Sequence, residues 1–541
     1  MNLAAAATLL AAILSGIAPP LHAADSPATP DKDAESKAQE LAGSIERFNA
    51  RDPQAPDTLN ARLAYAGFLA QMDGGDCRTR LDRAQSQLDL ARANPALGVA
   101  LPAGLARAAD AEYQVHSARA VCRGSDARDL ASPDAELRNT EFRAALESAQ
   151  RAVALYREAF DAVSMVTMQF NCAVAYHDLG DTAAAITALQ TAIAMDRDYG
   201  YEDDAEDNYS QLLQWNNLEA GPDQLAARMQ DFPERSATLA FDWYPGDAEV
   251  KIESDYNQVA DGEAWDLHST RSAHRSVRKG LASWKVSFQP AEAHFELANS
   301  PLKDLALEGL ATSIVGMLGQ FHDFELARNG EFDSSTEGSK FASRVRADLK
   351  ALTSGLAAKR IPAAQLMLTV ATALRAQQSP GAIEDLVAED YNFESGTWIG
   401  ATLDQGVWYN MTAALSLPLE RQVFVKNAIE FAYTRPIQCT DDAKETGCIE
   451  LVLHATPDPA VLSEMLGSLS RSARLPRRQR PQLQSRTDMR LIVDPITLVA
   501  YRRDMRRYSY WSSGAKGPNS SLVELEKTSI VSGPVSRTDG G

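Results

Sequence analysis

The sequence predicts an α+β protein in which a helical N-terminal part precedes a large antiparallel β-sheet. Small and apolar residues recur with the 3.6-residue period of a helix from about residue 33 to residue 233. Near Ser236 the period changes to two, which is typical of strands with one buried face. The chain has 541 residues, a length that suits more than one domain.

Composition excludes several classes of protein. Apolar residues make up 45% of the chain and charged residues 23%, which is ordinary for a globular protein and excludes a mostly disordered chain. The formal net charge is −20, whereas a nucleic-acid-binding protein needs a positive surface. We therefore expect no nucleic-acid partner.

The first 23 residues are expected to be a cleaved signal peptide. Residues 3–14 are apolar apart from Thr8, and small residues precede the expected cleavage after Ala23. The alternative, a short membrane anchor, requires about 20 apolar residues, more than this run provides. We thus expect a periplasmic or secreted protein that does not span the membrane.

The five cysteines fit an oxidising compartment. Cys439 and Cys448 flank a polar segment between two strand-like runs, which predicts a disulfide that closes a hairpin. Cys172 lies on an apolar helical face and is expected to be a buried thiol, which leaves Cys77 to pair with Cys122. No Cys-x-x-Cys motif is present, and we expect neither a metal site nor a cofactor.

The predicted helical domain covers residues 24–235 and contains a repeated pattern. Three segments place small and apolar residues at offsets of four and three, which puts them on one helix face. They are Ala84/Leu88/Ala91, Ala145/Ala149/Ala152 and Ala185/Leu189/Ala192.

The third of these segments belongs to a 34-residue unit, residues 166–199, that resembles a tetratricopeptide repeat. The matching positions are Ala173, Tyr176, Gly180, Ala185, Leu189 and Ala192. Gln169 and Arg197 depart from the pattern, and successive segments are 61 residues (84 to 145) and 40 residues (145 to 185) apart rather than 34. The resemblance implies a concave surface that binds a peptide or protein, lined by Asn171, Tyr176 and His177. A helical scaffold that only packs against the second half is the alternative.

The predicted sheet domain covers residues 236–532 and contains about nine to ten strands with inserted helices. It would be either a curved sheet or a half-barrel wrapped round a helix. Turns are expected at Asn329-Gly330 and Asp494-Pro495, and the tail at 533–541 is expected to be disordered. The expected strands lie around 250–252, 264–278, 284–288, 322–334, 407–417, 421–435, 449–453, 489–493, 498–511 and 521–531, and the expected helices at 301–320, 339–378 and 459–472.

The sequence contains no recognisable catalytic motif. No histidines stand at metal-binding spacings, and no Gly-x-Ser-x-Gly, Walker A or Gly-x-Gly-x-x-Gly segment occurs. The acidic cluster at Asp203, Asp204, Glu206 and Asp207 is interpreted as the solvated start of a helix rather than a calcium site. We therefore expect a protein that is not an enzyme.

An arginine-rich segment, residues 471–507, holds 11 Arg and three Asp. Its charge of +8 contrasts with −28 in the remainder of the chain. The favoured interpretation is a contact within the molecule or between subunits. A solvated loop and a site for an anionic ligand are the alternatives.

Two functions follow from these observations. The leading hypothesis is a protein-binding adaptor or scaffold that uses the helical array. The alternative is a carrier of an apolar ligand, a lipid or an acyl chain, held in the sheet domain under a helix that contains Leu366, Met367 and Val370. Six of the seven Trp lie in the second half, where they would line a pocket or form the core of the sheet.

Overall fold

The structure is a computed structural model. It describes residues 32–51, 56–72, 76–94, 97, 102–124, 133–216, 235–243, 245–260, 263–298, 322–335, 380–416, 424–440, 447–472, 482–512, 521–532 and 536–537. By contacts the chain divides into two compact units, one of residues 1–195 and 205–225 and one of residues 196–204 and 226–541. The expected domain boundary at residue 235 stays a prediction.

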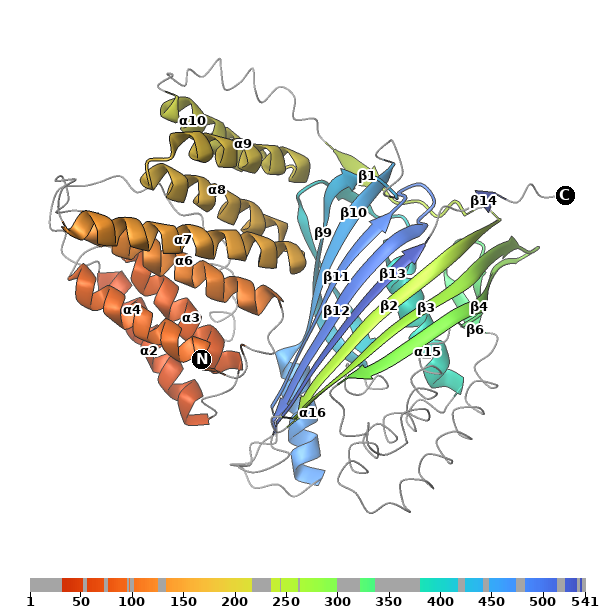
Figure 1. Cartoon of the computed structure of the whole chain (residues 1–541). Coiled ribbons are helices and arrows are strands. Elements are labelled where there is room, and N and C mark those ends of the chain that lie inside the picture. Colours follow the sequence, from red (N-terminus) through yellow and green to blue (C-terminus); the bar gives the residue numbers. More distant parts are fainter. Residues whose placement is uncertain are drawn as a thin grey trace. The chain divides into compact units, whose positions relative to one another are not determined.

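Helices form the described part of the first unit (Figure 1). α6 packs on α7, α7 on α8, and α3 on α2, α4 and α6. α9 and α10 continue from this series, and a few of their residues are counted with the second unit. The helices are α2 (Lys32–Arg51), α3 (Pro56–Gln71), α4 (Cys77–Arg92), α6 (Pro102–Gly124), α7 (Pro133–Glu158), α8 (Ala162–Asp178), α9 (Thr182–Tyr199) and α10 (Glu202–Trp215).

The repeated small and apolar residues are the core positions of these helices. All nine members of the three segments are at most 1% exposed, and they lie on α4, α7 and α9. Seven of the nine residues are alanine, whose small side chain lets neighbouring helices approach closely. The spacing therefore identified the buried face of each helix correctly.

The predicted helix–turn–helix unit at 166–199 is present as α8 and α9. α8 starts at its N-cap Asp161, whose side chain accepts a hydrogen bond from the Ser164 amide. The chain reverses at Gly180, which has a φ of +80°. Asp181 then accepts a hydrogen bond from the Ala184 amide at the start of α9. Membership of the tetratricopeptide family stays a prediction.

A single antiparallel sheet dominates the second unit (Figure 1). The strand order is β6-β5-β4-β3-β2-β13-β12-β11-β10-β9-β8, and β14 also pairs with β2. A separate pair joins β1 (Ser236–Thr238) to β7 (Thr402–Asp404). The strands of the large sheet are β2 (Gly246–Ala260), β3 (Glu263–Lys279), β4 (Ser283–Ala298), β5 (Phe324–Ala327), β6 (Phe332–Ser335), β8 (Trp408–Ser416), β9 (Phe424–Ile437), β10 (Cys448–Pro457), β11 (Gln482–Val493), β12 (Ala500–Ser512), β13 (Ser521–Ser532) and β14 (Ser536–Arg537).

The α+β fold class is therefore confirmed, and every expected strand region contains a strand. The expected number of strands was too low, because the 322–334 region is the hairpin β5–β6 and the tail adds β14. The expectation of disorder throughout 533–541 is wrong at Ser536 and Arg537. These residues pair with Asp247 and Gly246 of β2. Val250 is the last residue of β2 that pairs with β13, so β14 continues along the same side of β2.

Apolar side chains on one face of the sheet form two core clusters. One cluster includes Leu451, Met489, Leu491 and Met505 on β10, β11 and β12. The other includes Trp284 and Leu326, against which Tyr391 of helix α15 (Pro380–Glu394) packs. The sequence did not predict α15, whereas the expected helix at 459–472 is α16 (Pro459–Ser472).

Several sequence predictions lie outside the described residues. These are the signal peptide, the helices at 301–320 and 339–378, and the basic segment at 474–481. Leu366, Met367 and Val370, the residues of the carrier hypothesis, lie there too.

Candidate functional site

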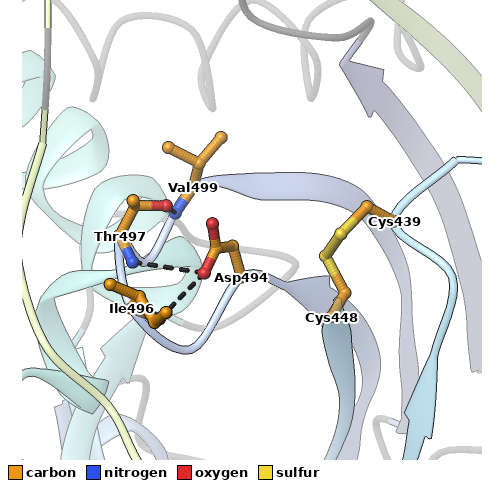
Figure 2. Close-up of a disulfide and its surroundings, with 6 residues drawn as sticks. All are labelled: Cys439, Cys448, Asp494, Ile496, Thr497 and Val499. Carbon is orange, nitrogen blue, oxygen red and sulfur yellow. Dashed lines mark hydrogen bonds between the residues drawn. A yellow bond between two sulfur atoms is a disulfide. The ribbon is translucent and has the colours of Figure 1, made fainter. Parts of the chain in front are cut away.

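Both predicted disulfides are present. Cys77, the first residue of α4, is bonded to Cys122 near the end of α6. Cys439 and Cys448 join the ends of β9 and β10 across a loop (Figure 2). Cys172 is buried and forms no disulfide, and burial raises the pKa of its thiol to about 12. Cys172 is thus an unreactive core residue at neutral pH.

The predicted Asp494-Pro495 turn closes β11 and β12 at the same end of the sheet as the second disulfide. Asp494 Oδ1 accepts hydrogen bonds from the amides of Ile496 (2.8 Å) and Thr497 (3.4 Å), as Figure 2 shows. Ile449, next to Cys448, pairs with Val493, next to Asp494. The disulfide therefore fixes the β9–β10 hairpin, and the hydrogen bonds of Asp494 fix the turn between the neighbouring strands β11 and β12.

An aromatic group on the first unit contains two of the three predicted binding residues. The rings of His177 and Trp215 stack with 4.5 Å between centroids and 7° between planes. The Tyr176 hydroxyl accepts a hydrogen bond from Gln150 Nε2 over 3.1 Å. Tyr176 and Trp215 are half-buried against Ala173, Leu189 and Ile193, and 46% of the His177 side chain is exposed. We call Phe170, Tyr176, His177, Tyr209 and Trp215 the aromatic patch.

Asn171 does not belong to this patch. It lies five and six residues before Tyr176 and His177, which places it more than about 100° away around α8. Its amide Nδ2 lies 3.4 Å from Met168 Sδ on the same helix. The structure therefore brings together Tyr176 and His177 but leaves Asn171 apart.

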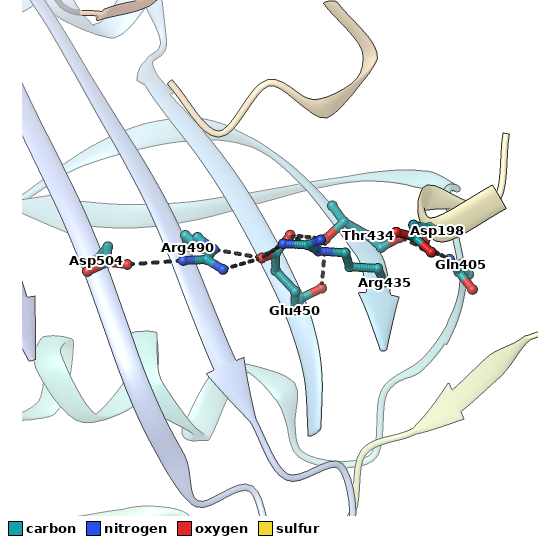
Figure 3. A network of polar contacts seen from close by, with 7 residues as sticks. All are labelled: Asp198, Gln405, Thr434, Arg435, Glu450, Arg490 and Asp504. Carbon is teal, nitrogen blue, oxygen red and sulfur yellow. Dashed lines mark hydrogen bonds and ion pairs between the residues drawn. The ribbon is translucent and has the colours of Figure 1, made fainter. Parts of the chain in front are cut away.

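A row of charged side chains crosses the sheet on the face opposite the apolar clusters (Figure 3). Glu450 on β10 accepts hydrogen bonds from Thr434 Oγ1 on β9 (2.8 Å) and from Arg490 Nε on β11 (2.7 Å). Arg490 Nη1 also reaches Asp504 Oδ2 on β12 (3.5 Å). Ser529 Oγ on β13 donates to Asp504 Oδ1 (2.7 Å). Five adjacent strands are thus linked by one polar network.

The electrostatics of this network favour an ionised carboxylate. Burial alone would raise the pKa of Glu450, but the guanidinium groups of Arg490 and Arg435 hold it below its usual range. Gln405, also in Figure 3, donates to the carbonyl oxygens of Thr434 (3.2 Å) and Asp198 (2.6 Å), all within the second unit. A carboxylate held this way is a structural anion rather than a proton donor.

A second buried carboxylate, Asp488 on β11, lies on the same face. Its Oδ1 is 2.6 Å from Arg486 Nε and 2.7 Å from His454 Nδ1, and 2% of its side chain is exposed. Burial by itself raises the pKa of Asp488, but Arg486 and His454 lower it below its usual value. Trp408 stacks on the His454 ring at 5.4 Å. His454 is therefore held by its neighbours, like an ordinary structural histidine.

Two buried arginines of the basic segment form ion pairs with α15. Arg507 Nη2 lies 3.0 Å from Glu389 Oε1, and the guanidinium of Arg503 lies 3.4 Å from carboxylate oxygens of Asp390 and Glu394. Both arginine side chains are 4% exposed. The favoured interpretation, an intramolecular contact, is confirmed for this part of the segment.

Sequence reasoning missed the acidic partners Glu450, Asp488 and Asp504. A signal was present in β11, where Arg486, Asp488 and Arg490 alternate with Thr487, Met489 and Leu491. Charges at a period of two predict a polar sheet face. The partners of these charges could be identified only from the register in which β11 pairs with β10 and β12, and alternation does not give that register.

Neither a metal-binding cluster among the described residues nor a similarity to known proteins indicates a ligand for this chain. No cluster of His, Cys, Asp and Glu able to hold a metal occurs in the part of the chain that the structure describes. Among the same residues, no helix is both long and apolar enough to cross a membrane. Comparison of the sequence with protein-family models gives no match, and comparison with curated proteins gives none either.

Proposed function

We propose that this chain is a periplasmic or secreted adaptor whose first unit binds a segment of another protein at the aromatic patch. The observation that supports this is the stacked pair of His177 and Trp215, which leaves nearly half of the His177 side chain exposed on a surface of aromatic rings. Aromatic side chains at a surface provide large contact area with little loss of conformational entropy, so they are frequent in protein interfaces.

The charge near the patch indicates the chemistry of the partner. The parts of α8–α10 in the first unit, residues 162–195 and 205–216, contain four acidic side chains and no Lys or Arg. Two of the acidic residues, Glu206 and Asp207, lie one turn or less before Tyr209 on α10. A partner segment with basic residues beside an aromatic or aliphatic one would complement this surface.

The two disulfides support the proposed compartment, since disulfides persist in oxidising surroundings. The tetratricopeptide resemblance supports the proposed mode of binding, since such arrays present the first helix of each pair to a ligand. α8 is the first helix of the best-matching unit, and it carries Tyr176 and His177.

Site-specific photocrosslinking in the native compartment tests the proposal. In one variant a photoreactive amino acid replaces His177. In a control variant it replaces Thr191, an exposed residue on the face of α9 opposite Leu189 and Ile193. We expect a discrete crosslinked protein at position 177 that is absent at position 191. Trp215→Ala should remove the crosslink and Trp215→Phe should retain it, with both variants melting as folded proteins. Equal crosslinking at 177 and 191 would contradict the proposal.

A further inference from the structure

The two edges of the large sheet differ in length and chemistry. β6 forms one edge; it has four residues and includes Asp333. β8 forms the other edge; it has nine residues, Trp-Tyr-Asn-Met-Thr-Ala-Ala-Leu-Ser, with no charge and no proline. Proteins usually protect edges with short strands, charges, prolines or bulges, because an unpaired strand is a template for another. β6 has such protection, whereas β8 has none of these features.

The apolar face of the sheet is less buried at β8 than on the neighbouring strands. Its inward residues Tyr409, Met411 and Leu415 pack on the core cluster but are only half-buried. On the next two strands, Ile429 and Leu451 in the same cluster are 2% and 1% exposed. A further strand beside β8 would bury the half-exposed side chains in the same way.

All nine residues of β8 pair with β9, from Trp408–Ala432 to Ser416–Phe424. Among the described residues, no strand pairs with the other side of β8. The regular register without a bulge leaves a straight edge along the whole strand.

We propose that β8 pairs antiparallel with β8 of a second copy of this chain, so that the two sheets join into one across a twofold axis. Full overlap of two nine-residue strands centres the axis on Thr412. Tyr409 then lies opposite Leu415, and Met411 opposite Ala413, so both inward faces stay on the same side. Because β8 has no charged residue, no like charges oppose each other at the seam.

This interface concerns the sheet and is independent of the aromatic patch. A second copy is the occupant favoured by the sequence of β8, because the strand is complementary to itself in the register that overlaps all nine residues.

Light scattering of the full chain over a dilution series tests the proposal, and we expect a dimer. Thr412 is exposed on the outer side of β8, so Thr412→Glu and Thr412→Lys should both fold. In each homodimer two like charges would lie directly opposite at the axis, which should weaken association by about tenfold. Mixing the two variants should restore the dimer, because opposite charges then face each other. Thr191→Glu, on the first unit, is the matched control and should dimerise like the native chain.

A monomeric native chain would overturn the proposal. A dimer that neither Thr412 variant weakens, or that the mixture does not restore, would place the contact elsewhere and overturn it too. Thr412→Cys adds a test that does not depend on weakened association: a disulfide-linked dimer under oxidising conditions is expected, whereas Asp333→Cys on β6 should give none. Co-purification of a different chain in place of the second copy would also refute self-pairing.

Discussion

Arg507 on β12 donates a hydrogen bond to Glu389 on α15 over 3.0 Å, and 4% and 6% of the two side chains are exposed. Loss of one partner leaves the other charge buried without its neighbour, so Glu389→Leu or Arg507→Met should each lower the free energy of unfolding by about 3–5 kcal/mol. The double variant should lose much less than the sum. Urea unfolding of the four proteins gives the coupling energy.

Arg502→Met is the control for this cycle, because Arg502 is 43% exposed in its ion pair with Asp504. Exposed pairs contribute about 0–1 kcal/mol, so this variant should unfold almost like the native chain. Single-variant effects at Glu389 and Arg507 that simply add would show that the pair does not hold α15 on the sheet.

Gly330, in the predicted Asn-Gly turn, is expected to tolerate no side chain. Its φ is +89°, and a Cβ there would lie 2.5 Å from Phe241 Cγ and 2.8 Å from Ile399 Cδ1. Gly400 has a similar φ of +78° but no atom within 4 Å of a Cβ. Gly400→Ala should therefore show only the backbone cost of about 1–2 kcal/mol, and Gly330→Ala should add about 1–3 kcal/mol for overpacking. Thermal melts of both variants compare the two costs, and equal losses would refute the contribution of packing.

Local patterns predicted the elements, and long-range pairing decided what they build. The nine small and apolar residues of the helical segments are all buried, because a helix face follows directly from residue spacing. Alternation likewise located the strands. It did not show that β2 pairs with β13, whose partners Ile252 and Ile530 are 278 residues apart in sequence. No local pattern encodes such a contact.

The same limit explains the candidate sites. Tyr176 and His177 were predicted from a repeat pattern, but Trp215, which stacks on His177, lies on another helix and was not. Arg503 and Arg507 were recognised as charges that need partners. Their partners lie on α15, a short helix whose acidic residues Glu389, Asp390 and Glu394 face the sheet. A helix exposed to solvent could have the same acidic composition. The sequence alone therefore does not distinguish a solvated acidic helix from one that forms ion pairs with the sheet.

Asp110 should make the stability of the first unit depend on pH. Burial raises the pKa of its carboxyl to about 6, although hydrogen bonds from Gln114 and Tyr156 lower it. The unfolded chain loses this proton near pH 4, so it binds fewer protons than the folded state between about pH 4 and pH 6. The free energy of unfolding therefore falls as pH rises through this window and levels off above it.

Asp110→Asn removes this dependence, because Asn does not ionise and still accepts a hydrogen bond. At neutral pH the variant should be more stable than the native chain, by about 3 kcal/mol at most. Near pH 4 the two should be equal. Denaturant unfolding across the window measures the difference, and a difference that does not change with pH would contradict the raised pKa.

The two disulfides should stabilise to different degrees because they close loops of different length. Cys77 and Cys122 are 45 residues apart, and Cys439 and Cys448 are nine apart. Restriction of the unfolded chain gives about 4 kcal/mol for the longer loop and about 2.5 kcal/mol for the shorter one. The variants Cys77→Ser/Cys122→Ser and Cys439→Ser/Cys448→Ser leave no unpaired thiol behind, and calorimetry of each measures its loss. Adding a reductant to the native chain should reproduce the sum of the two losses and should leave a variant that lacks both disulfides unchanged. If the shorter loop proved the more stabilising, the hairpin at β9–β10 would owe its stability to contacts in the folded state rather than to restriction of the unfolded chain.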